Sequence, residues 1–161
     1  MTITQSQLEE KARALLIERG VHVKDIAELV FFLQEAYIND LSLEMCMLSV
    51  DAVLSKREVQ NAILTGIQLD IFAENKQLMA PLQDIIAQDE GLYGIDEILA
   101  FAIVNVYGSI GFTNYGYIDK VKPGILAKLN DHTQPHVHTF LDDIVGAIAA
   151  AAASRLAHQQ P

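Results

Sequence analysis

Residues 141–158 read LDDIVGAIAAAAASRLAH, and this stretch decides the fold. Alanine has the highest helix propensity of all residues, so the stretch predicts a long helix. Its small side chains allow other backbones to approach closely, which places this helix near the centre of a bundle. No sequence repeat, low-complexity segment or linker divides the chain. We therefore predict an all-α fold: residues 1–161 form a single domain, a multi-helix bundle with a central alanine-rich helix.

The rest of the chain also shows helical periodicity of its apolar residues. Helices are predicted over residues 8–19, 24–37, 43–54, 56–76, 81–87 and 95–107, the last of them buried on most sides. Gly20 ends the first helix, and Ser42 can cap the third. Residues 108–116 contain three glycines and are predicted to form a loop or a loosened helix. Residues 119–130 are predicted to be helical, with a start or a kink at Pro123. Only residues 136–140 favour a brief extended segment.

Composition narrows the possible functions. Of the 161 residues, 51% are hydrophobic, which is enough for a packed core, and 21 acidic residues against 11 basic ones give a net charge of −10. This charge argues against a nucleic-acid partner, because such partners require a basic face. The single cysteine, Cys46, excludes an internal disulfide and is expected to be a buried thiol. The longest apolar run has ten residues, whereas a membrane span needs about 20. We expect a cytoplasmic protein with at most peripheral membrane contact.

Three acidic groups are the main candidates for chemistry: Asp96-Glu97, Asp119 and Asp142-Asp143. Such residues in a first helical turn often only stabilise the helix dipole. Here, however, each group precedes a segment that is too apolar for the surface, and an unpaired buried charge is not tolerated. Mg²⁺, or Mn²⁺ or Ca²⁺ in its place, would balance these carboxylates. Neighbouring helical residues diverge by about 100°, so Asp142 and Asp143 can span two ions, or supply one ligand and one base.

Basic and imidazole side chains lie near these carboxylates in the sequence. Lys120 and Lys122 are the only basic residues between Lys76 and Lys128, and either could neutralise a phosphate or remain on the surface. His136 and His138 would point to the same face of an extended segment. Metal ligation and acid–base catalysis are both open to them, as is a loop histidine bound to backbone.

Four elements together resemble the phosphatidylglycerophosphatase A family, in its soluble branch from Gram-positive bacteria. They are Asp96-Glu97 before an apolar helix, Asp119 before Val121-Lys122-Pro123, Val137-His138, and residues 142–147, DDIVGA. The resemblance covers residues 89–158. It implies a compact bundle with a central helix and a Mg²⁺-dependent phosphatase that removes the terminal phosphate of phosphatidylglycerophosphate. The glycine-rich N-terminal element of membrane-embedded members has no match here, and Gly116 stands where those members have an arginine.

The resemblance also assigns roles to individual residues. It makes Asp96, Glu97, Asp119, Asp142 and Asp143 the metal-binding residues. Lys122 matches the lysine near the phosphate and His138 the loop histidine, so that Asp143, Lys122 and His138 are the candidate catalytic residues. The partner would be a phosphorylated small molecule or a lipid headgroup.

Two alternatives to a soluble Mg²⁺-dependent phosphomonoesterase stay open. In the first, the chain is a non-catalytic, oligomeric binding module that retains the acidic metal site. Its N-terminal helical half would then form a subunit interface, and a homo-oligomer is expected in either case. The second is an all-α nucleotide pyrophosphohydrolase. The sequence disfavours it because the candidate carboxylates lack the Glu-x-x-Glu spacing of that class.

Overall fold

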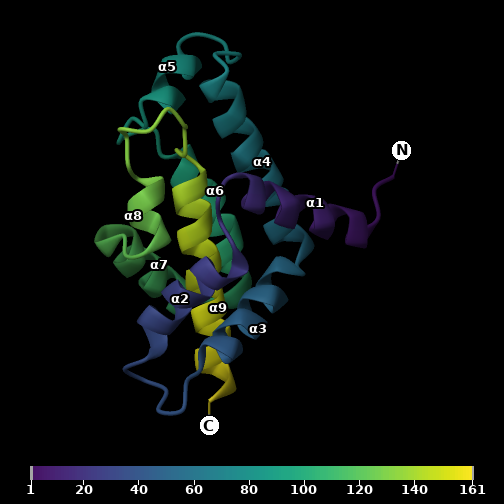
Figure 1. Cartoon of the computed structure of the whole chain (residues 1–161), viewed down its shortest axis with the longest axis vertical. Coiled ribbons are helices and arrows are strands. Elements are labelled where there is room, and N and C mark those ends of the chain that lie inside the picture. The colour runs from purple at the N-terminus through teal and green to yellow at the C-terminus, as the bar shows by residue number, and fades with distance from the viewer. Residues whose placement is uncertain (1, 161) are drawn as a thin grey trace.

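Helix α9 (Leu141–Gln159) runs through the middle of the molecule, and the other helices surround it (Figure 1). The structure, a computed structural model, describes residues 2–160, and within that range it contains helices and no strand. The surrounding elements are α1 (Gln5–Glu18), α2 (Val23–Gln34), α3 (Leu43–Leu54), α4 (Arg57–Glu74), α5 (Leu82–Ala87), α6 (Ile95–Val104), the 3₁₀ helix η1 (Asn105–Tyr107), α7 (Ser109–Val121) and α8 (Ile125–Leu129). The predicted all-α fold with a central alanine-rich helix is confirmed.

The small side chains of α9 allow close packing on all sides. Every residue from Leu141 to Ser154 is buried, and α2, α3, α6 and α7 pack directly against this helix. Gly66 on α4 also allows close packing against α9, because a Cβ atom there would collide with the side chain of Ile144. The N-terminal end of α9 lies near α5, and its C-terminal end reaches the opposite end of the molecule (Figure 1).

Several local predictions from the sequence are confirmed. Helix α3 has the predicted bounds, and the Ser42 hydroxyl caps it by accepting a hydrogen bond of 3.2 Å from the Met45 amide. Gly20 follows α1 in the left-handed region, with φ of +83°. The Cys46 thiol is fully buried. Within residues 2–160, no helix combines the length and apolar character that crossing a bilayer requires.

Residues 108–116, predicted to form a loop or a loosened helix, are helical over most of their length. Residues from Ser109 onward form the regular helix α7, whose Tyr115 and Ile118 are buried. Gly111 serves close packing, because a Cβ atom there would lie 2.9 Å from a side-chain carbon of Val104. The predicted helix at Pro123 is instead a complete break: α7 ends at Val121 and α8 begins at Ile125.

Two further expectations need correction. Helix α6 is less buried than predicted, since Ile95 is 53% exposed and Ile98 is 61% exposed. Residues 136–140, predicted to be briefly extended, form no strand in the part of the chain that the structure describes: 136–138 are irregular and 139–140 form a turn. In the N-terminal half, apolar side chains such as Leu16 and Val30 pack inside this chain, whereas Ile17 and Leu48 are 56% and 62% exposed. The predicted homo-oligomer stays a prediction.

A carboxylate from α4 caps the start of α9. The fully buried Asp70 accepts hydrogen bonds from the amides of Phe140 (3.0 Å to Oδ1) and Leu141 (2.9 Å to Oδ2). These amides are among those that lack a partner inside the helix. Asp70 therefore decides where α9 begins and which of its residues enter the core.

Replacing this cap should destabilise the fold. Asp70→Ala leaves two buried amides without an acceptor, so we expect the free energy of unfolding to fall by about 1–3 kcal/mol. Urea denaturation followed by circular dichroism measures this change. Asp40→Ala, at an exposed carboxylate, is the matched control and should change stability by about 0.5 kcal/mol or less. Equal stability of both variants would show that the cap does not matter.

Candidate functional site

Lys122 brings together the acidic groups of α7 and α9. Its Nζ atom lies 3.1 Å from Asp119 Oδ1 and 3.5 Å from Asp142 Oδ2. Burial alone would lower the pKa of Lys122, but the charges of Asp142 and Asp119 raise it above its ordinary value. The lysine is therefore a permanent ammonium beside the first turn of α9, as its predicted role near a phosphate requires.

The backbone at Lys122 is strained. It has φ of +49°, a left-handed conformation that non-glycine residues adopt uncommonly, and Pro123 follows it. Asp89, which precedes α6, also has a positive φ, at +51°. Strain of this kind persists where the surrounding structure imposes it and tends to occur at functional sites. Here it ends α7 so that the lysine side chain turns back toward Asp119 and Asp142.

Asp142 and Asp143 both lie in the interior. The Asp143 carboxylate accepts a hydrogen bond of 2.8 Å from the Tyr115 hydroxyl, and its amide donates to Asp142 Oδ1 over 2.8 Å. Burial raises the pKa of both carboxyl groups. The charge of Asp142 and hydrogen bonding to Asp96 raise that of Asp143 further. With only one ammonium nearby, the pair is therefore driven toward its protonated forms, and a bound cation could take the place of those protons.

Asp96 and Asp89 complete this acidic cluster. Asp96, in the first turn of α6, is buried as predicted. Asp89 is a residue that the sequence did not single out. Burial and the charge of Asp96 raise its pKa, and its own charge acts on Asp142. In the sequence, Asp89 lies in the turn-forming stretch Gln88–Gly91, where an aspartate is common and indicates no particular function.

Glu97 is not brought into the cluster. Its side chain is exposed on α6, and no hydrogen bond or ion pair within residues 2–160 joins it to the other carboxylates. Lys120 is likewise exposed. The structure therefore gathers Asp96, Asp119, Asp142 and Asp143 of the predicted metal-binding residues and leaves Glu97 outside.

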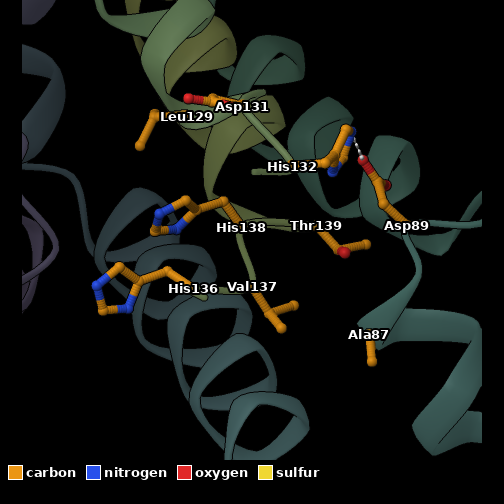
Figure 2. Close-up of a pocket in the computed structure, with 9 residues that line it drawn as sticks. All are labelled: Ala87, Asp89, Leu129, Asp131, His132, His136, Val137, His138 and Thr139. Carbon is orange, nitrogen blue, oxygen red and sulfur yellow. Dashed lines mark ion pairs between the residues drawn. The ribbon is translucent and has the colours of Figure 1, made fainter. Parts of the chain in front are cut away.

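His138 lies in a second cluster with Arg19 and Glu74, on the side of α1 and α4. Arg19 Nη2 lies 3.3 Å from His138 Nδ1, and Glu74 accepts hydrogen bonds of 2.8 Å from Arg19 and 2.7 Å from the Val137 amide. As predicted, the rings of His136 and His138 project to the same side of their segment, with ring centroids 5.8 Å apart (Figure 2). Neither Arg19 nor Glu74 was predicted, because only tertiary structure brings them to this loop.

Two cavities flank His138. The smaller, of about 20 Å³, extends from Asp89 and His132 to the paired histidines (Figure 2). The larger, of about 210 Å³, is lined by Glu18, Arg19, Gly20, His136 and His138. His138 therefore faces open space while its neighbours fix its orientation.

The donor set suits a hard cation. Aspartate oxygens are the ligands that Mg²⁺ prefers, and the buried excess of carboxyl groups gives a divalent cation a charge to balance. As the side chains lie, no three histidine, cysteine, aspartate or glutamate side chains within residues 2–160 converge on one point that could hold a metal ion. The chemistry of the residues fits Mg²⁺, and binding would require their carboxylates to turn toward a common centre.

Comparison with known proteins identifies the family of the chain. The sequence model of the family described as Phosphatidylglycerophosphatase A matches residues 17–158. The chain belongs to the phosphatidylglycerophosphatase A family. The match includes the whole acidic cluster and also Arg19 and Glu74, so the resemblance found in the sequence is confirmed and extends further toward the N-terminus.

Relatives of this family member cover almost its whole length. It is 68% identical over 154 residues to YutG of Bacillus subtilis and 54% identical over 155 residues to YpjQ of the same organism, covering 93% and 87% of those proteins and 96% of this chain each time. The crystal structure of the low temperature requirement C protein from Listeria monocytogenes is 73% identical, with a TM-score of 0.94 over 96% of this chain and 98% of that one. The crystal structure of YpjQ superposes with a TM-score of 0.93 at 52% identity, over 97% of this chain and 96% of that one.

The environment of His138 predicts a contribution to acid sensitivity. Burial, together with the charges of Arg19 and His136, lowers the pKa of His138 from 6.5 to about 4. Below pH 6.5 the unfolded chain therefore binds a proton that the folded ring does not, so His138 reduces stability as the pH falls from 6.5 to 4. His138→Gln removes this pH-dependent loss of stability. The melting temperature of the wild type should fall relative to that of His138→Gln over this range, and a constant difference would contradict the assignment.

Proposed function

We propose that this protein is a Mg²⁺-dependent phosphomonoesterase that removes the terminal phosphate of phosphatidylglycerophosphate or a related phosphorylated substrate. Its family membership supports the reaction class. The observation that carries the proposal is the buried Asp142-Asp143 pair with the Lys122 ammonium beside it. A phosphate monoester is highly anionic, so a site with so many carboxylates can accept it only with a cation present. Mn²⁺ or Ca²⁺ could take the place of Mg²⁺.

Each residue of the cluster has a role in this proposal. Asp96, Asp119, Asp142 and Asp143 would hold the ion, with Asp89 beside them, while Glu97 stays a ligand implied by resemblance alone. The chemistry that bound Mg²⁺ supplies is polarisation of the phosphoryl oxygens and a lower pKa for water. The Lys122 ammonium stabilises negative charge on the phosphoryl oxygens. Tyr115 fixes one oxygen of Asp143, which leaves the other oxygen to bind the ion or to accept the proton of the attacking water.

The expected setting is the cytoplasm, with the substrate a phosphorylated small molecule or a lipid headgroup. Peripheral membrane contact would allow a lipid to be reached, and exposed apolar side chains near the acidic cluster support it. Leu92 is 93% exposed and Ile95 is 53% exposed, and both come shortly before Asp96 in the sequence.

A homo-oligomer is also proposed, and sedimentation at micromolar concentration tests it.

The decisive experiment measures phosphate release by metal-free protein titrated with Mg²⁺ and Mn²⁺. The substrates are phosphatidylglycerophosphate in mixed micelles and a panel of soluble phosphomonoesters. We expect metal-dependent release, and a fall in kcat of about 100-fold or more for Asp143→Asn, because this change removes both a ligand and a proton acceptor. Asp84→Asn, at an exposed carboxylate on α5, is the matched control and should keep full activity.

Undiminished turnover by Asp143→Asn would contradict the proposed site. Metal binding without turnover of any substrate would contradict the enzyme and support the alternative, a binding module that retains its metal site.

A further inference from the structure

Arg19 connects the N-terminal half of the chain to the histidine loop. It stands at the C-terminal end of α1, and its side chain is only 9% exposed. The guanidinium binds Glu74 through both terminal nitrogens, at 2.8 and 3.2 Å, and donates to the Val137 carbonyl over 2.8 Å. Three elements that are distant in sequence, α1, α4 and the loop before α9, therefore meet at this one side chain.

The same guanidinium fixes the proton of the His138 ring. Arg19 Nη2 lies 3.3 Å from His138 Nδ1. A guanidinium has only donors and carries no lone pair to accept a hydrogen bond. His138 Nδ1 must therefore present its own lone pair, because a proton there would face the protons of Arg19. In the neutral ring the remaining proton is on Nε2.

The ring is also held neutral. Burial, the charge of Arg19 and that of His136 together lower the pKa of His138 to about 4, against a weaker opposing effect of Glu74. At neutral pH the His138 ring is thus an uncharged Nε2–H donor. It has no lone pair on the nitrogen that faces away from Arg19, which makes it unsuited to bind a metal ion.

His136 has the opposite arrangement. Its Nδ1 lies 3.3 Å from Glu74 Oε1. Burial raises the pKa of Glu74, but the hydrogen bond from Arg19 outweighs this effect and the pKa is lowered to about 2. Glu74 is therefore ionised, and its oxygens can only accept hydrogen bonds. His136 must carry its proton on Nδ1. The Arg19–Glu74 pair thus makes Nδ1 an acceptor in His138 and a donor in the neighbouring His136.

We propose that Arg19 is a positioning residue: it fixes His138 as a neutral Nε2–H donor for a hydrogen-bond acceptor of a ligand in the adjoining cavity. The identity of the acceptor rests on the proposed function, whereas the state of the ring does not. The groups that face the ring are Arg19, His136 and Glu74, and the cavity of about 210 Å³ beside it is open to a ligand. His138 is therefore assigned to donating a hydrogen bond to a ligand and excluded from the metal ligands at neutral pH.

Nuclear magnetic resonance of the full-length protein labelled with ¹⁵N-histidine tests this directly. Two-bond ¹H–¹⁵N correlations distinguish the two neutral forms of imidazole from each other and from the cation. At pH 7 we expect the His138 ring to be protonated at Nε2 alone, with its signals assigned by their loss in His138→Gln. A wild-type ring that is protonated at Nδ1, or at both nitrogens, would overturn the proposal without any variant.

Substitution of Arg19 then tests the cause. In Arg19→Met, the Nδ1 signal of His138 should shift toward the protonated form, whereas Arg19→Lys, which keeps a cationic donor, should shift it less. A folded Arg19→Met protein with an unchanged His138 ring would overturn the role of Arg19. If Arg19→Met does not fold, Glu74→Gln tests the pair instead: it weakens the anchor of the guanidinium, so the His138 Nδ1 signal should move toward the protonated form, and an unchanged ring would overturn the role of the pair.

Turnover separates this inference from the proposed function. Gln can place an amide N–H near the position of imidazole Nε2, so His138→Gln should keep more activity than His138→Ala. Equal loss in both would contradict a donor role for His138. If no phosphomonoester is hydrolysed, the proposed function fails, and the ring's measured state still decides the inference about Arg19.

Discussion

Two carboxylates on one face of α4 hold the chain where α9 begins, and the site depends on them. Asp70 accepts from the amides of Phe140 and Leu141, and Glu74, one helical turn later, accepts from the amide of Val137. Together they fix the path of residues 137–141. Asp142 and Asp143 follow immediately, so their entry into the interior is set by hydrogen bonds that come from another helix.

The second constraint is the burial of α9 from Leu141 to Ser154. A helix of small residues at the centre of a bundle has no solvent-exposed face on which to place charged side chains. Its first-turn aspartates are therefore buried, and α7 supplies their partners: Tyr115 for Asp143 and Lys122 for Asp142. One ammonium does not offset two buried carboxyl groups, so their ionised forms would need a cation, in the place where a phosphatase of this kind would bind one. The same packing that stabilises the fold thus creates the electrostatic requirement of the site.

The sequence predicts well what local periodicity and composition determine. The helices through α6, the central position of α9 and the burial of Asp96, Asp142 and Asp143 all follow from runs of apolar or small residues. A loop was one of two alternatives for residues 108–116 because glycine composition alone does not distinguish close packing, as at Gly111, from a loop. Glu97 was grouped with Asp96, although adjacent helical residues point about 100° apart and only one of them faces inward. Asp70, Glu74, Arg19 and Asp89 could not be found from spacing, because each acts on residues that are distant in the sequence.

The central claim is that the carboxylates at the start of α9 form a cation site. Anomalous diffraction from crystals soaked in Mn²⁺ tests it most directly, because it locates the ion without reference to activity. The account predicts a peak within about 2.0–2.3 Å of oxygens of Asp142 or Asp143, with at least one ligand from Asp96 or Asp119. No peak at this position in crystals soaked at millimolar Mn²⁺, or ions found only at exposed carboxylates such as Glu97, would contradict it.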